Sequence, residues 1–100
     1  MVTVYSSGML TPAQSRAARA LINWSQPKLA MASGVSVSTI RDFETGKRQP
    51  IGNNLIAIQN ALEAAGVILV AENGDGPGVR LKKAKPAAIG AEDLNASNDD

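Results

Sequence analysis

The sequence predicts a small, mainly α-helical domain of four or five helices, followed by a β-hairpin and an acidic tail. Three observations lead to this class. Apolar residues recur at helical spacing between capping residues from position 11 to position 66. A β-branched run and an alternating run then flank a glycine-rich turn. The last residues are rich in Ala, Asn and Asp, which is typical of a disordered segment.

The pattern divides the chain into four segments. We expect an N-terminal arm at 1–10, a helical domain at 11–66, a β-hairpin at 67–83 and a disordered acidic tail at 84–100. Val2 and Val4 alternate within the arm, which is therefore either an added strand or a loose terminus.

The composition excludes most catalytic and metal chemistry. The chain contains no cysteine and no histidine, so disulfides, thiolate or imidazole metal sites and Ser-His nucleophiles are absent. No pair of carboxylates stands out as a general acid and base. We therefore expect no metal and no cofactor, and an enzyme is the class that the sequence favours least.

The charge is unevenly distributed. Residues 1–85 carry all ten Lys and Arg and five acidic residues, a net charge of +5, whereas residues 86–100 carry four acidic residues and a net charge of −4. A basic body suits a polyanionic partner, although such a charge also serves solubility. No apolar run approaches the roughly 18 residues of a membrane span, and the first ten residues lack signal-peptide features, so we expect a cytoplasmic protein without membrane contact.

Capping residues predict the helix boundaries. Thr11, Pro12 and Gln14 form the start of a first helix, with Thr11 and Gln14 as a capping box. Ser25 caps a short second helix, which ends at Gly34 in a tight turn. Ser36 caps a third helix, which ends near 45–46, and a fourth helix runs from about 52 to 65.

The hairpin is predicted to have one face for the helices and one for a partner. We expect Ile68 and Val70 to pack on the fourth helix. A lone two-stranded hairpin is marginally stable in water, so its other face needs cover. We expect that face to pair across a two-fold axis in a homodimer through Val67, Leu69, Val79 and Leu81.

Two short helices joined by a tight turn at 26–45 carry the functional signal. Such helices cross at a steep angle, which demands small and apolar residues at fixed positions. The segment resembles the Cro/phage-repressor (XRE-like) type of helix-turn-helix over roughly residues 10–66. The matching positions are Ser25-Gln26, Leu29-Ala30, Gly34-Val35, Thr39-Ile40, Glu44 and Gly46-Lys47-Arg48. The resemblance implies a lambda-repressor-like fold.

The resemblance also implies how double-stranded DNA is bound. The third helix enters the major groove, and its exposed face is expected to contact bases through Val37, Ser38, Arg41 and Asp42. Val37 stands where better-known phage repressors have glutamine, and Asp42 is unusual near phosphates. Phosphate contacts are expected from Gln26, Lys28, Ser36, Thr39, Thr45, Lys47 and Arg48. The resemblance further pairs Arg19 with Glu44 in a structural ion pair.

Three functions remain open at this point. The first is a bacterial or phage transcription regulator that binds a palindromic operator as a homodimer, most simply as a repressor. The second is an antitoxin whose acidic tail folds on a toxin. The third is an adaptor or antiactivator that kept the fold, lost DNA binding and binds another regulator; Val37 and Asp42 favour it.

Overall fold

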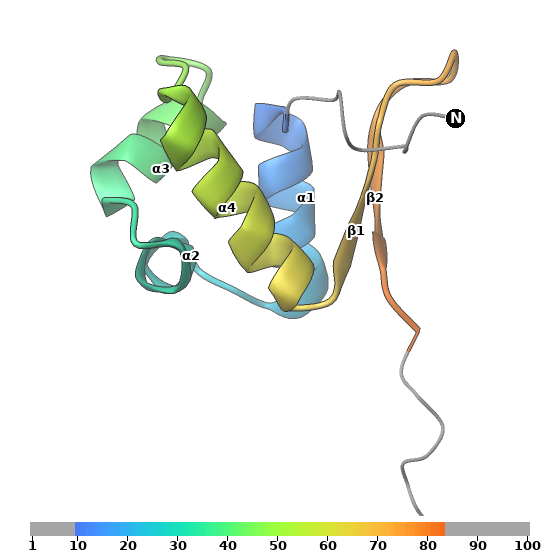
Figure 1. The fold of residues 1–100 in the computed structure, drawn as a ribbon, viewed down its shortest axis with the longest axis horizontal. Helices are drawn as coiled ribbons and strands as arrows, with labels where there is room; N and C mark the ends of the chain where they lie inside the picture. Colours follow the sequence, from blue (N-terminus) through green and yellow to red (C-terminus); the bar gives the residue numbers. More distant parts are fainter. Residues whose placement is uncertain (1–9, 84–100) are drawn as a thin grey trace, which may run out of the picture.

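The computed structural model describes residues 10–83, so the predicted arm at 1–9 and the predicted tail at 84–100 lie outside the described residues. The described part contains four helices and a two-stranded antiparallel sheet (Figure 1). This agrees with the predicted fold class. The elements are α1 (Pro12–Ile22), α2 (Gln26–Ser33), α3 (Val37–Glu44), α4 (Gly52–Ala64), β1 (Val67–Val70) and β2 (Gly78–Leu81).

The predicted caps form at the first three helices. Thr11 Oγ1 accepts from the Gln14 N–H at 3.0 Å, and Gln14 Oε1 accepts from the Thr11 N–H at 3.0 Å, which completes the capping box. Ser25 and Ser36 each accept a backbone N–H three residues later, so each ends the preceding turn and starts a helix. Gly34 closes α2 in the left-handed conformation with φ of 75°.

The core lies between the four helices and beneath the hairpin. Leu29 of α2, Ile40 and Phe43 of α3, and Ile58 and Leu62 of α4 are all fully buried. They come from three helices that are short enough to be unstable alone, so mutual burial of these side chains is what holds the helices in place. The α2–turn–α3 unit packs on the other two helices, α2 against α4 and α3 against α1.

The hairpin packs with the opposite face from the one predicted. Val67 and Leu69 are 3% and 4% exposed and belong to the core of the chain, and Val79 packs against that core, so these three are not a free surface for a second copy. Of the four residues of the predicted dimer face, Leu81 alone is exposed, at 51%. The register explains this, because Ile68 pairs with Arg80, and directly opposed residues share one face of a sheet. Arg80 needs water, so the face that carries Ile68 turns outward and the Val67 face turns to the helices.

The side chain of Gln14 joins the hairpin to α1. Its Nε2 donates to the carbonyls of Val70 and Gly78 at 3.0 and 2.9 Å, one on each strand. Because its Oε1 already caps α1, this one buried amide ties the helix start to both strands. Figure 1 shows the two strands running alongside α1, on the side away from α3.

Among the described residues, no helix is long and apolar enough to cross a membrane. The same part of the chain holds no group of three or more carboxylates that could bind a metal ion.

Candidate nucleic-acid interface

The third helix has one buried side and one exposed side. Ile40, Phe43 and Glu44 face the core. Val37 is 40% exposed, and the Arg41 side chain is 59% exposed. Ser38 is exposed next to them. Val37 and Ser38 lie four and three residues before Arg41, so the three side chains project from the same side of α3.

Asp42 lies beside this exposed row rather than in its centre. Its side chain is 21% exposed, and its Oδ1 is 3.9 Å from Nε of Arg41. At this distance the carboxylate attracts the guanidinium without forming a hydrogen bond. Asp42 therefore places a negative charge near Arg41 without a hydrogen bond that would occupy Arg41 Nε.

Ser36 and Thr39 are occupied by the start of α3. The Ser36 hydroxyl donates to Thr39 Oγ1 at 2.8 Å and accepts from the Thr39 N–H at 3.2 Å. Ser38 Oγ lies 3.3 Å from Ser36 Oγ. The three hydroxyls therefore form one small network at the N-terminal end of the helix, where the backbone N–H groups favour an anion.

The loop after α3 folds back on the last turn of the helix. The backbone N–H groups of Lys47 and Arg48 donate to the carbonyl of Asp42 at 2.8 and 3.2 Å. Thr45 Oγ1 donates to the carbonyl of Arg41 at 3.0 Å. Lys47 and Arg48 are exposed, so the loop places two cations beside the C-terminal end of α3.

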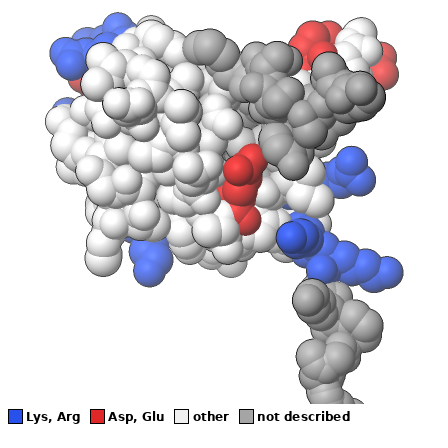
Figure 2. Space-filling view, viewed as in Figure 1, with Lys and Arg blue, Asp and Glu red and all other residues white. Residues whose placement is uncertain are grey.

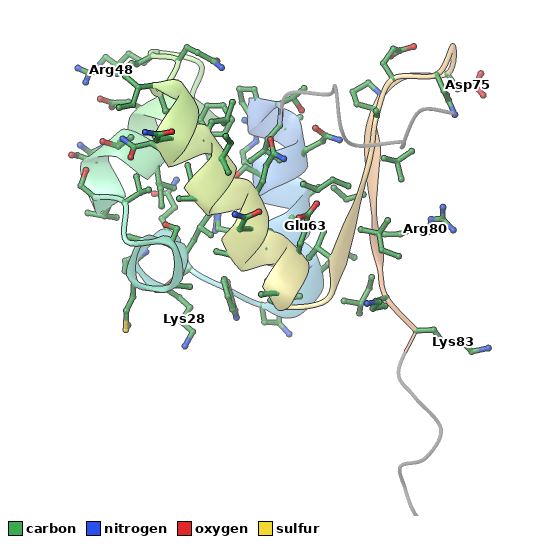
Figure 3. All side chains as sticks on the ribbon, viewed as in Figure 1. Lys28, Arg48, Glu63, Asp75, Arg80 and Lys83 are labelled. Carbon is green, nitrogen blue, oxygen red and sulfur yellow. The ribbon has the colours of Figure 1, made fainter. Side chains whose placement is uncertain are left out.

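Lys28 is the predicted phosphate contact that lies apart from this group. Its Nζ is 5.7 Å from the centre of the Trp24 ring, which is within the range of a cation–π interaction. Figure 3 shows Lys28 and Arg48 on different sides of the helical part. The basic side chains visible in Figure 2 likewise lie around the edge of the molecule, with Lys28 below the helices and Arg80 on the hairpin side.

Glu44 is the centre of a buried polar cluster that holds α1, α2 and α3 together. Its side chain is 1% exposed, and its Oε1 lies 2.7 Å from the guanidinium of Arg19, which also donates through Nε. Ser15 donates to Oε2 at 2.5 Å, and Gln26 Nε2 donates to Oε1 at 3.0 Å. The two residues that the resemblance pairs are therefore in direct contact.

Burial by itself raises the pKa of Glu44, because it removes water from the carboxylate. The hydrogen bonds from Arg19, Ser15 and Gln26, together with the positive charge of Arg19, outweigh the burial and leave the pKa below its ordinary value. Glu44 is therefore held as an anion. Its role is structural, since both oxygens are used within the chain.

Gln26, which is predicted to contact a phosphate, also belongs to the cluster around Glu44. One proton of its side-chain amide is directed at Glu44, and an amide NH₂ has two protons, so one remains available to a phosphate. Glu44 thus fixes the orientation of Gln26 at the start of α2.

Sequence reasoning missed two members of this region. Ser15 lies one helical turn before Arg19 on α1, and this spacing was a signal that both residues face the same partner. Arg16 is exposed, and its guanidinium donates to the backbone carbonyl of Glu44. It stabilises the C-terminal end of α3 and adds a cation near the loop of Lys47 and Arg48.

Comparison with known proteins agrees with this geometry. A family described as helix-turn-helix, of the Cro/phage-repressor and XRE-like type, matches residues 16–64, from α1 to the last residue of α4. The hairpin lies outside the matched region. No curated protein matches the chain at a significant level.

Proposed function

We propose that this chain is a sequence-specific DNA-binding transcription regulator of the Cro/phage-repressor (XRE-like) type, because its residues 16–64 match that helix-turn-helix family. In this proposal it acts as a repressor, binds a palindromic operator as a homodimer and inserts α3 into the major groove of double-stranded DNA. One helix-turn-helix makes too few contacts for useful specificity, which is the reason for the dimer.

The observation that carries the proposal is the exposed row of α3. Arg41 presents donors that can bind the two acceptors of guanine, and Ser38 can bond to a base edge or a phosphate. Val37 is apolar and exposed, and it suits the methyl group of thymine. The row rises from a helix whose other side is fully buried, so its position relative to the rest of the domain is fixed.

The phosphate contacts in this proposal flank that row. Lys47 and Arg48 lie beyond the C-terminal end of α3, and Gln26 lies at the start of α2, held by Glu44. Arg16 joins the predicted set because it is exposed beside the same loop. Such contacts fix the register on the duplex and carry no sequence information themselves.

The test compares two exposed arginines. Arg41→Ala is expected to weaken binding to the preferred duplex by about 1 to 3 kcal/mol and to relax specificity at one base pair. Arg80→Ala removes an equally charged side chain from the hairpin, away from α3, and is expected to change affinity less than about twofold. Fluorescence anisotropy over a salt series measures both. Equal effects of the two substitutions would contradict base contact by Arg41.

One observation favours a second candidate, an adaptor or antiactivator that binds a protein through the same helix. Asp42 places a carboxylate next to the exposed row, where DNA phosphates would repel it. In that case Arg41→Ala would weaken binding of a protein partner, and no DNA sequence would be preferred. The antitoxin alternative depends on the acidic tail, which lies outside the described residues.

A further inference from the structure

The outer side of α4 is an exposed surface with almost no charge. Asn53, Ile56, Asn60 and Ala64 follow one another at spacings of three or four residues, and all four are exposed. Ile56 is 54% exposed, which leaves a large apolar side chain in water. Glu63, at the border of this row, is the single charged residue among the 13 residues of α4.

An exposed helix face normally carries several charges, so this composition calls for a reason. Figure 2 shows this lack of charge. The surface over α4 is white except for one acidic side chain, which Figure 3 identifies as Glu63. We call the row of Asn53, Ile56, Asn60 and Ala64 the α4 face. A charged partner gains nothing from it, whereas a partner with an equally neutral face fits it.

We propose that the α4 face binds a second copy of this chain, with the two α4 helices antiparallel across a two-fold axis near Ile56. The inference rests on the proposed function, which requires a dimer, and it places the interface on α4 because the hairpin buries Val67 and Leu69 within the chain. The face is self-complementary in this arrangement. Asn53 precedes Ile56 by three residues and Asn60 follows it by four, so each Asn53 meets the partner's Asn60.

The polar and apolar parts both match under this symmetry. Each amide can donate and accept, so an Asn53 and the partner's Asn60 satisfy one another. Ile56 and the partner's Ile56 cover each other at the axis. Figure 1 shows α4 on the viewer's side of the molecule with α3 at one edge, so a copy lying on α4 leaves the outer edge of α3 open to DNA.

The size of the face predicts where the dimer forms. A helix of 13 residues is about 20 Å long and about 10 Å wide, a footprint of roughly 200 Å². A standard stable interface buries about 800 Å² on each partner. The pairing is therefore weak in dilute solution and forms mainly on DNA, where two adjacent half-sites raise the effective concentration of one copy near the other.

Single cysteines provide the test, because the natural chain has none. Ile56→Cys and Leu81→Cys are compared, since Ile56 and Leu81 are 54% and 51% exposed and both are apolar. Each full-length variant is oxidised mildly with and without the duplex enriched from genomic DNA, and dimers are counted on a non-reducing gel. We expect a disulfide-linked dimer for Ile56→Cys that increases with duplex, and monomer for Leu81→Cys.

A second measurement separates the inference from the proposed function. Ile56→Asp is expected to weaken binding to the two-half-site duplex about tenfold or more, while binding to a single half-site and the melting temperature stay as in the wild type. Leu81→Asp is the matched control. Dimers of Leu81→Cys alone, or no dimers from either cysteine on a duplex that the wild type binds, would overturn the inference and leave the function standing. If the wild type prefers no duplex, the proposed function fails, and linked dimers formed without DNA still report on the α4 face.

Discussion

Replacing Glu44 with glutamine removes one charge from the polar cluster without changing its volume. Both carboxylate oxygens accept hydrogen bonds, Oε1 from Arg19 and Gln26 and Oε2 from Ser15 and Arg19. Glutamine keeps one oxygen and replaces the other with NH₂, which turns a donor toward a donor. It also leaves Arg19 without its counter-ion, beside a position 44 whose side chain is almost fully buried.

The magnitude follows from burial. Breaking a buried ion pair by removing one partner destabilises a protein by about 3 to 5 kcal/mol. The Arg19 side chain is 19% exposed, so water screens part of its orphaned charge, and we take the lower end of the range, about 3 kcal/mol. In a domain of this size that corresponds to a melting temperature lower by about 12 to 24 °C.

Thermal and urea unfolding followed by far-UV circular dichroism measure this change. Glu63→Gln is the control, since Glu63 is a half-buried carboxylate on the outside of α4, and it is expected to change stability by less than about 0.5 kcal/mol. Our account of the cluster is refuted if Glu44→Gln and Glu63→Gln unfold at the same temperature.

Three further predictions concern the pH dependence of the Glu44 cluster, the turn at Gly34 and the contact of Gln14 with the hairpin. The pKa of Glu44 is lowered in the folded chain, so its contribution to stability is present above its ordinary pKa of 4.5 and is lost as the pH falls through the lower folded value. Urea unfolding should therefore show a steeper loss of stability in acid for the wild type than for Glu44→Gln, and equal slopes would contradict this. Gly34→Ala should lower the free energy of unfolding in urea by about 1 to 2 kcal/mol, because alanine is strained at a φ of 75° although its methyl group would meet no neighbour. An unchanged urea midpoint would show that alanine is not strained in this turn. Gln14→Ala should speed hydrogen exchange at the amides of β1 and β2, because it frees the carbonyls of Val70 and Gly78; exchange as slow as in the wild type would mean that the amide does not anchor the hairpin.

The helices were predictable because each of their ends carries its own local chemistry. Thr11, Ser25 and Ser36 were predicted as caps and are caps in the structure. Gly34 adopts a positive φ in the turn after α2, a conformation that glycine adopts without steric strain. The cap at Ser25 has one hydrogen bond, since the backbone N–H of Lys28 donates to Ser25 Oγ and the Lys28 side chain has no acceptor to offer in return. These signals act over three or four residues, which is the range that a sequence shows directly.

The hairpin's orientation and the polar contacts of Gln14 and Gln26 were harder to predict because they depend on contacts distant in sequence. The face assignment needed the register, which pairs Ile68 with Arg80 and turns that face to water. Gln14 was predicted as a cap, but its bonds to both strands lie 56 and 64 residues away. Gln26 reaches Glu44 only after α2 and α3 have crossed. Such contacts belong to the packed fold rather than to any local pattern.

The most direct test of the central claim is selection of genomic DNA by the purified wild-type protein, followed by a salt titration on the enriched duplex. We predict a two-fold-symmetric site whose half-sites are about one helical turn apart, roughly 10 base pairs, with affinity that falls steeply as salt rises. Enrichment of no sequence, with weak binding at low salt that Arg41→Ala leaves unchanged, would contradict a role in reading DNA.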